Sequence, residues 1–137
     1  MRIVCDTNVL VSGFLFKGNP RKILRLASQG HVENYISPEI LHEVEEVLRR
    51  PKFAVASPEI RLVIELFQRT FTLVTPTTRV NAVPRDQDDN AVIEAALEAG
   101  AAQIVSGDRH LRKLARWRHI GIVSPAQFLA AYRSGTP

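Results

Sequence analysis

Short apolar runs rich in β-branched residues recur along the chain between longer segments with helical periodicity. The runs are RIVC (2–5), NYIS (34–37), TLVT (72–75), QIVS (103–106) and GIV (121–123). Each run is three or four residues long, which is typical of a buried strand and too short for a helix. Strands that alternate with helices form βα units and a parallel sheet. The pattern therefore predicts a three-layer α/β fold with a central, mainly parallel sheet, and the length predicts a single domain over 1–137.

Proline marks the expected helix starts. A polar residue precedes proline at four places, which are Asn19, Ser37, Ser57 and Ser124. Asn and Ser are favoured N-caps, and proline suits the first helical position because its missing N–H would have no partner there. These pairs predict helices over 20–29, 38–49, 58–70 and 125–132, and an alanine-rich segment predicts another over 90–99. Gly30 and Gly100 are placed to end two of the helices in the left-handed conformation.

Acidic residues gather where the expected strands end. Asp6 directly follows the first strand, and Asp108 follows the fourth. The segment before the alanine-rich helix adds a cluster of three aspartates, Asp86, Asp88 and Asp89. Binding sites in open parallel sheets form at the carboxyl ends of the strands. Although a single Asp after a strand is often only a turn residue or an N-cap, several at one edge indicate a site.

Helix geometry adds a glutamate to these acids. The apolar stripe of the helix over 38–49 consists of Ile40, Leu41, Val44, Val47 and Leu48. Glu43 and Glu45 flank opposite edges of this stripe, whereas Glu39 and Glu46 point further towards solvent. Geometry alone therefore leaves both Glu43 and Glu45 as candidates. By the same reasoning, Asp89 lies on the buried side of the alanine-rich helix.

Carboxylates that converge at one sheet edge need a compensating charge. Two unit charges ~4 Å apart repel by about 4 kcal/mol at an effective dielectric constant of 20, so such a cluster either takes up protons or binds a cation. Oxygen ligands suit Mg²⁺ or Mn²⁺ and not zinc. A metal held in this way activates water and stabilises the oxygens of a phosphodiester under attack. The reaction class that follows is metal-assisted phosphodiester hydrolysis.

Four segments in order along nearly the whole chain match a known family. They are VCDTNVLVSG (4–13), SPEILHEVEEVLRRPKF (37–53), DQDDNAVIEAALEAGA (86–101) and IVSGDRHLRKL (104–114). In these segments the chain resembles the PIN domain family, a group of small α/β metal-dependent nucleases. Within that family it is similar to the toxin-like, VapC-type ribonucleases of bacterial toxin–antitoxin pairs.

The resemblance implies a role for each matching residue. The four metal-binding acids correspond to Asp6, Glu43, Asp89 and Asp108, so that Glu43 is preferred over Glu45. Asn8 and Ser106 correspond to supporting polar residues, and Asp86 and Asp88 to extra acids. The resemblance further implies Mg²⁺ or Mn²⁺ as cofactor, RNA as substrate cleaved to leave a 5′-phosphate, a small antitoxin protein as partner, and a homodimer or larger homo-oligomer.

Composition limits the setting and adds candidate RNA contacts. The net charge of +4 permits an anionic partner such as nucleic acid without requiring one. Basic residues that could guide a phosphate backbone to the acids are Lys17, Arg21, Arg109 and Arg112, although such residues can also form a solvated face. For Trp117 we expect a packing role rather than base stacking. A single cysteine favours a reducing, cytoplasmic setting, and no apolar run approaches the ~20 residues that span a membrane.

Two other functions compete with the ribonuclease hypothesis. A phosphatase with an aspartate nucleophile also begins with a strand that ends in Asp, but it needs a second acid two residues later, where this chain has Asn8. A catalytically weak PIN-like module that binds RNA or protein is the other alternative. The presence of all four acids argues against a degraded site.

Overall fold

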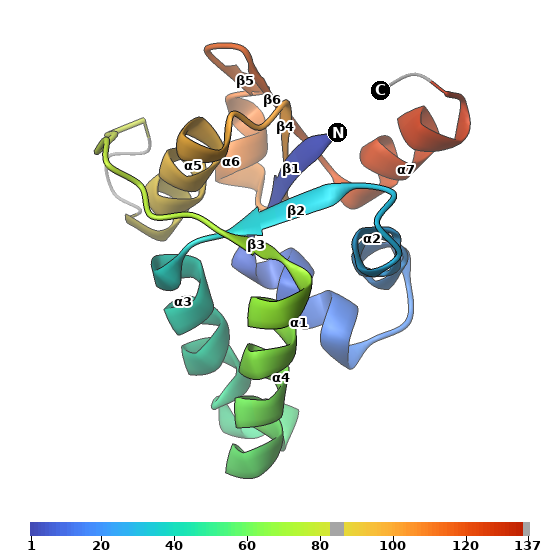
Figure 1. Ribbon diagram of the computed structural model, residues 1–137, viewed down its shortest axis with the longest axis vertical. Helices are drawn as coiled ribbons and strands as arrows, with labels where there is room; N and C mark the ends of the chain where they lie inside the picture. The colour runs from blue at the N-terminus through green and yellow to red at the C-terminus, as the bar shows by residue number, and fades with distance from the viewer. Residues whose placement is uncertain (83–86, 136–137) are drawn as a thin grey trace.

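The computed structural model describes residues 1–82 and 87–135, without the side chains of residues 87 and 88. Its sheet has the strand order β3-β2-β1-β4-β6-β5 (Figure 1). The strands are β1 (Arg2–Cys5), β2 (Glu33–Ile36), β3 (Thr72–Leu73), β4 (Gln103–Val105), β5 (Arg116–Trp117) and β6 (Ile120–Val123). Every pairing is parallel except that of the edge strand β5 with β6, which is antiparallel. The predicted mainly parallel α/β sheet is confirmed.

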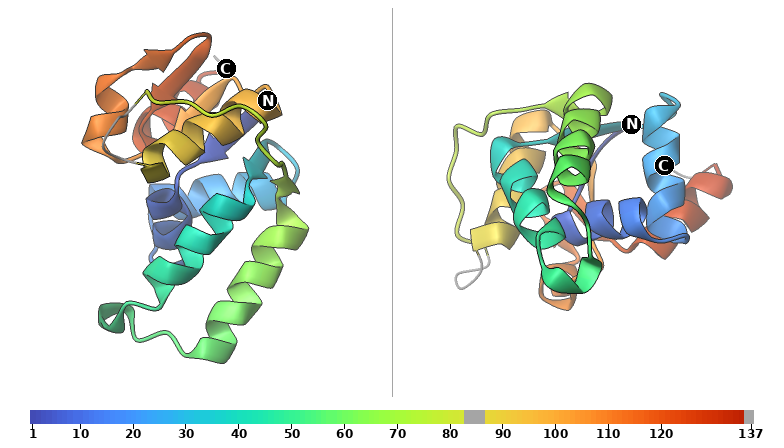
Figure 2. Two further views of the ribbon diagram at one scale, coloured as in Figure 1. Left: turned by 90° about the vertical axis from the view of Figure 1, so that its left-hand side faces the viewer. Right: turned by 90° about the horizontal axis from the view of Figure 1, so that it is seen from below.

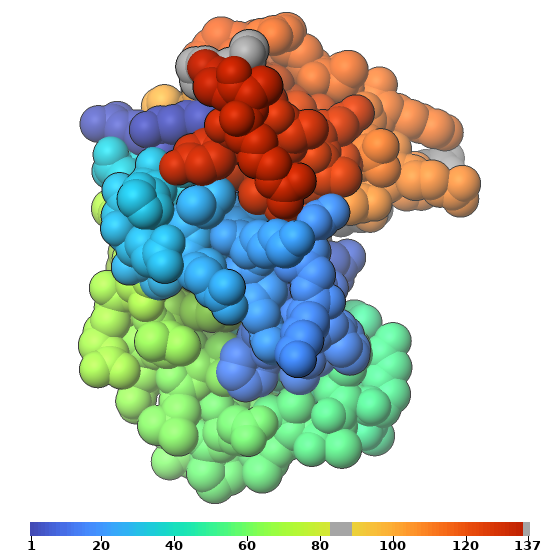
Figure 3. Space-filling view, turned by 90° about the vertical axis from the view of Figure 1, so that its right-hand side faces the viewer, coloured from blue at the N-terminus to red at the C-terminus, as the bar shows by residue number. Residues whose placement is uncertain are grey.

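Helices flank this sheet. They are α1 (Thr7–Leu15), α2 (Asn19–Ser28), α3 (Pro38–Leu48), α4 (Ser57–Thr70), α5 (Gln87–Ala99), α6 (Arg109–Lys113) and α7 (Pro125–Arg133), and a 3-10 turn, η1, spans Pro51–Phe53. Helix α5 packs over β1, β2 and β4, while α2 packs between α1 and α7 in another layer (Figures 1 and 3). The α3–α4 pair extends beyond the sheet (Figure 2). Within the described residues, no helix is both long and apolar enough to cross a membrane.

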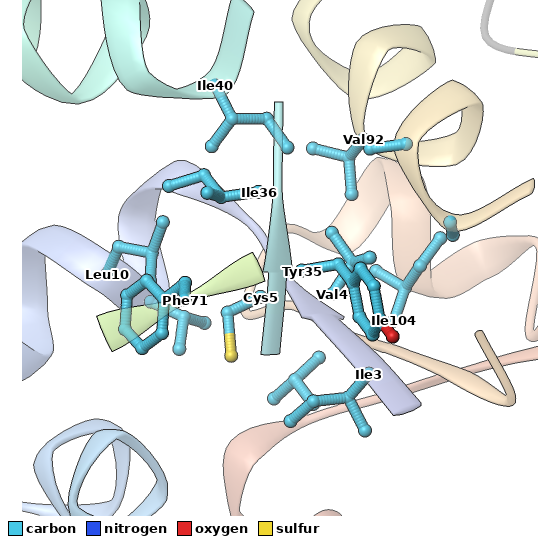
Figure 4. Packing of buried hydrophobic residues seen from close by; sticks show 14 of the residues in the cluster. Ile3, Val4, Cys5, Leu10, Tyr35, Ile36, Ile40, Phe71, Val92 and Ile104 are labelled. Atoms are coloured by element: carbon cyan, nitrogen blue, oxygen red, sulfur yellow. The ribbon is translucent and has the colours of Figure 1, made fainter. Parts of the chain in front are cut away.

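The core sits on the central strands, because helices cover both faces of the sheet. Ile3, Val4 and Cys5 of β1 have no exposed surface, and neither do Ile36 of β2 and Ile104 of β4 (Figure 4). Burial raises the pKa of the Cys5 thiol well above its usual range, so this cysteine packs as a small apolar side chain. Strand β1 lies between β2 and β4, which puts its carboxyl end at the middle of the sheet edge.

The helix starts confirm two of the four expected N-caps. The hydroxyls of Ser37 and Ser124 accept hydrogen bonds from the backbone N–H groups of Ile40 and Gln127, at 3.3 and 3.1 Å. The other two expectations are wrong by one position, because Gly18 and Ala56 precede α2 and α4 without a side-chain cap. None of the first N–H groups of a helix has an intrahelical partner, so proline fits the second helical position as well as the first. Proline therefore predicts the first turn and not the capping residue.

The glycines after α2 and α5 end these helices as expected. Gly30 and Gly100 have φ angles of 81° and 64°, in the left-handed region. After α2, the N–H groups of Gly30 and His31 donate to the carbonyl oxygens of Ala27 and Leu26, at 3.1 and 2.9 Å. These two bonds form a Schellman motif, which satisfies carbonyl groups at the end of the helix.

The pattern did not predict the first helix, α1. Its sequence, TNVLVSGFL, contains β-branched residues and Gly13, all of which lower helix propensity. Tertiary packing stabilises α1 instead. A Cβ atom added at Gly13 would lie 2.5 Å from Cδ1 of Leu24, so the absence of a side chain at Gly13 lets α1 and α2 approach closely.

Candidate active site

Asp6 joins the first strand to the first helix. Its N–H extends the sheet by donating to the carbonyl oxygen of Val105 at 3.0 Å. Its side chain caps α1, because Oδ1 accepts a hydrogen bond from the Val9 N–H at 2.9 Å. The carboxylate is only 4% exposed. Asp6 is thus held rigidly at the carboxyl end of β1, as the sequence pattern predicted.

Ser106 connects Asp6 to Asp108. The buried Ser106 hydroxyl donates to Oδ2 of Asp6 and accepts from the N–H of Asp108 at 3.0 Å. Asp108 is half-buried and caps α6, since its Oδ1 accepts from the N–H groups of His110 and Leu111 at 2.7 and 3.1 Å. One oxygen of Asp108 is therefore used to start a helix, and its link to Asp6 is indirect.

Three carboxylates line one hollow beside the sheet edge. Asp6 comes from the end of β1, Glu43 from α3, and Asp89 from α5. The hollow is about 20 Å³ in volume, which is room for about one water molecule. Its other lining residues are Thr7, Asn8 and Val92. Elements far apart in the sequence thus bring three of the four predicted acids to one place.

The structure distinguishes between the two candidate glutamates of α3. Glu43 is half-buried and lines the hollow. Glu45 is not among the lining residues and instead forms an ion pair with Arg49, one turn later, at 3.2 Å. Asp89 is 7% exposed, on the buried side of α5 as expected. Asp86 lies outside the described residues, and the Asp88 side chain is also outside them.

The donor set has the chemistry that a hard divalent cation requires. Asp6, Glu43 and Asp89 offer only carboxylate oxygens, and the lining Asn8 and Thr7 add amide and hydroxyl groups. The buried Thr7 Oγ1 has no hydrogen-bond partner among residues 1–82 and 87–135. In the same part of the chain, no three Asp, Glu, His or Cys side chains are close enough to form a ready-made metal site. The residues fit a cation that also takes ligands from water and substrate.

Burial controls the ionisation of Asp6. Loss of hydration raises the pKa of the Asp6 carboxyl to about 6. The hydrogen bonds from Ser106 and Val9 oppose this rise, and the nearby charge of Asp108 adds to it. The carboxyl is therefore mostly ionised at neutral pH, yet at a cost that a bound cation would remove.

Sequence reasoning missed Asn34, which supports the site from β2. This residue is 2% exposed, and its Oδ1 accepts a hydrogen bond from the Cys5 N–H at 2.9 Å. The bond fixes the backbone immediately before Asp6. An amide residue inside an apolar strand was the available signal, because a buried Asn needs hydrogen-bond partners.

The basic candidates fall into two groups. Arg21 donates from Nε and Nη2 to the carbonyl oxygens of Gly13 and Phe14, at 3.1 and 2.7 Å, and so closes the end of α1. Lys17 is exposed beyond this end of α1, which lies about 14 Å along the helix axis from Asp6 at 1.5 Å per residue. Arg109 and Arg112 are exposed on α6, directly after Asp108.

Trp117 has the packing role that we expected. Its ring is half-buried against the core, and the guanidinium of Arg118 lies over it, 4.4 Å from the ring centroid. The indole is therefore covered on that face rather than presented to a base.

Comparison with known proteins identifies the family. The PIN domain family matches residues 2–110. The chain belongs to the PIN domain family. PIN domains are generally nucleases. An uncharacterized protein of Methanocaldococcus jannaschii is 31% identical over 144 aligned positions, which cover 96% of this chain and 92% of that protein.

Solved structures of other proteins share the fold at low sequence identity. The structure of VapBC2 from Rickettsia felis, bound to a DNA fragment from its promoter, matches with a TM-score of 0.65 and 11% identity over 90% of this chain and 98% of that one. The PIN domain endonuclease Utp24 matches with a TM-score of 0.53 and 13% identity, over 90% and 84% of the two chains. PAE2754 from Pyrobaculum aerophilum matches with a TM-score of 0.56 and 16% identity, over 98% and 90%.

Proposed function

We propose that this PIN domain is an endoribonuclease that depends on Mg²⁺ or Mn²⁺ and hydrolyses RNA with water as the nucleophile. The observation that carries the proposal is the convergence of Asp6, Glu43 and Asp89 on one water-sized hollow at the sheet edge. Three carboxylates at one hollow supply the oxygen donors that a hard divalent cation prefers, and family membership makes nuclease chemistry the natural use of such a cation.

Asp6, Glu43 and Asp89 would hold the metal, with Asp108 as a more distant fourth acid. Mg²⁺ is usually bound by one or two carboxylates together with waters and substrate phosphate, so a ready-made set of three protein ligands is not required. When bound, the metal supplies an activated water and charge neutralisation at the phosphodiester.

The protein's own groups orient this chemistry. The Val9 N–H and the Ser106 hydroxyl each hold one oxygen of Asp6, so the carboxylate keeps one rotamer. Asn8 lies on the exposed rim of the hollow, where its amide is available to an RNA phosphate or ribose. Arg109 and Arg112 beside Asp108 supply positive charge for the RNA backbone, and Lys17 and Arg21 are secondary candidates.

We also propose that the protein is the toxin of a toxin–antitoxin pair, with a small antitoxin as partner and with homodimers or larger homo-oligomers in solution. The fold shared with VapBC2 supports this assignment. The single buried, reduced cysteine is in keeping with a cytoplasmic location.

RNA cleavage tests the nuclease proposal. Structured and single-stranded RNAs are incubated with the full chain in Mn²⁺, in Mg²⁺ and in chelator, beside the variants Asp89→Asn and Glu45→Gln. We expect products with 5′-phosphates that form only when metal is present. Replacement of a residue that supports metal ligands typically lowers activity 10–100-fold, so Asp89→Asn should lower the cleavage rate by more than that. Glu45→Gln should cleave RNA at an unchanged rate. Cleavage in chelator, or full activity of Asp89→Asn, would contradict the mechanism.

A second function is favoured by one observation. The described acids do not form a ready-made metal site, which is what a PIN domain that binds RNA or protein without cleaving it would show. Absence of cleavage of every RNA, together with absence of Mn²⁺ binding, would support this alternative.

A further inference from the structure

Charge is distributed very unevenly along the chain. Residues 109–137 contain six of the 18 Lys and Arg residues and none of the 14 Asp and Glu residues. Residues 1–108 hold the other 12 basic residues and all of the acids, so that part of the chain is slightly negative. The positive net charge of the protein therefore comes from the C-terminal stretch.

Most of this positive charge lies on one surface beside the acids. The basic surface, as we define it, consists of five exposed residues on α6, on β5 and in the turn after β5, which are Arg109, Arg112, Lys113, Arg116 and Arg118. The three ion pairs found among residues 1–82 and 87–135 all lie elsewhere. The α6–β5 region stands out from the body of the molecule (Figure 3, upper right, in orange).

The other side of the candidate active site has the opposite charge. A cleft of about 770 Å³ separates α3 from α5 and from the segment over 79–81. Four glutamates line it, Glu39, Glu43, Glu46 and Glu94, together with Arg79 and with His42, which contacts Glu46 at 2.7 Å. Arg79 is itself paired with Glu94, at 3.5 Å. Acidic side chains therefore outnumber basic ones in this cleft, which disfavours a phosphate backbone there.

The basic surface begins at the candidate active site. Its first residue, Arg109, follows Asp108, whose N–H is bonded to Ser106, and Ser106 donates in turn to Asp6. Positive charge within about 10 Å still acts on a phosphate at 0.1 M salt. Attraction on the α6 side and repulsion on the α3–α5 side give an approaching RNA one preferred direction.

We propose that RNA reaches the acids across the basic surface and not along the α3–α5 cleft. The proposal rests on the ribonuclease function proposed above. The contacts are to the phosphate backbone, because Arg118 covers one face of the only tryptophan and the surface offers mainly cations. Binding on this surface is therefore largely independent of base sequence, and selectivity has to come from elsewhere in the site.

Salt-dependent binding tests this route. A fluorescein-labelled single-stranded RNA is titrated with the full chain in chelator at several salt concentrations, and binding is followed by anisotropy. The test variant is Arg112→Gln/Lys113→Gln. The control Arg50→Gln/Lys52→Gln removes the same charge at exposed positions near the far end of α3. Each lost phosphate contact lowers the slope of log K against log salt by about 0.7, which amounts to roughly 25-fold weaker binding at 0.1 M salt for two contacts.

The control is expected to bind RNA within about twofold of the wild-type chain. Equal RNA affinities of the test variant and the control would overturn the proposal. The proposal would also be overturned if Lys17→Gln/Lys22→Gln lost RNA binding while the test variant kept it. Because chelator blocks metal-dependent cleavage, the result does not depend on catalysis. If RNA binding depends on Arg112 and Lys113 but no RNA is cleaved in the presence of metal, the proposed binding surface stands and only the proposed ribonuclease function fails.

Discussion

At the residue scale, Asp6 combines a structural and a chemical role. One of its oxygens caps α1 and the other accepts from Ser106, while the carboxylate also lines the hollow. Capping alone would not require a charged residue at this position, because Asn or Ser caps a helix as well as Asp does. The buried negative charge is the feature that stability alone does not explain.

This burial predicts how stability changes with pH. The pKa of Asp6 rises from its ordinary 3.8 to about 6 in the folded protein, so the unfolded state loses this proton more readily. Between about pH 4 and pH 6, ionisation of Asp6 therefore lowers the free energy of unfolding, by up to about 3 kcal/mol for a shift of this size. Asp6→Asn lacks this group and keeps a capping oxygen.

Urea unfolding of both proteins in chelator, from pH 4 to pH 7, measures the effect. The free energy of unfolding of Asp6→Asn, minus that of the wild-type chain, should increase as the pH rises through this range. A difference that stays constant with pH would show that the Asp6 carboxylate carries no such penalty. The variant is also expected to lose RNA cleavage, although its stability relative to the wild-type chain rises between pH 4 and pH 7.

At the element scale, α5 holds one wall of the α3–α5 cleft. Glu94 is 6% exposed and accepts the Val80 N–H at 2.9 Å. One turn later, the exposed Glu98 accepts the N–H and the hydroxyl of Thr77, at 3.0 and 2.9 Å. The two glutamates fasten the chain after β3 along α5, even though this segment has no regular secondary structure over 76–81.

Replacement of these glutamates should have unequal effects. Glu94→Ala removes the acceptor of the part-buried Val80 N–H and should lower the free energy of unfolding by about 1–3 kcal/mol. Glu98→Ala, at an exposed site, should cost less than about 1 kcal/mol. Hydrogen exchange of the Val80 amide should accelerate in Glu94→Ala. Equal destabilisation by both variants, with unchanged exchange at Val80, would contradict this role for Glu94.

The elements also show which signals in the sequence were sufficient. Short β-branched runs predicted most strands, because a strand that is buried on both faces of the sheet has a continuous apolar sequence. Pairs of a polar residue and proline predicted most helices, because proline is favoured in the first helical turn. Helix α1 left no such trace, because its residues have low helix propensity and its packing on α2 and α3 stabilises it instead. The antiparallel β5 was missed as well, because Arg116 and Trp117 stand among basic residues and form no apolar run.

At the scale of the whole molecule, strand topology explains why the acids could be predicted only in part. Binding sites commonly form at the carboxyl end of a central strand, so the local pattern alone makes Asp6 a candidate. The choice of Glu43 over Glu45 depends on the rotation of α3 relative to the sheet, which one sequence does not contain. The role of Asn34 was missed because it too depends on the fold. Its hydrogen-bond partner, Cys5, is 29 residues away in the sequence.

Acidic and basic surfaces meet at the candidate active site. The hollow with three carboxylates shares Glu43 with the acidic cleft, and the basic surface begins directly after Asp108, which Ser106 links to Asp6. A bound divalent cation would neutralise part of the negative charge near Asp6, so metal and RNA should each favour binding of the other. Metal binding and RNA binding should be coupled in this way because the acids lie where the acidic cleft and the basic surface meet.

Direct titration of Mn²⁺ tests the central claim that these carboxylates form a metal site. Calorimetry at pH 7 compares the wild-type chain with Glu43→Gln and with Glu45→Gln, which makes the same change on the same helix outside the hollow. We predict Mn²⁺ binding by the wild-type chain, unchanged affinity in Glu45→Gln, and affinity at least tenfold lower in Glu43→Gln. Equal affinities in the two variants, or no binding by the wild-type chain, would contradict the account.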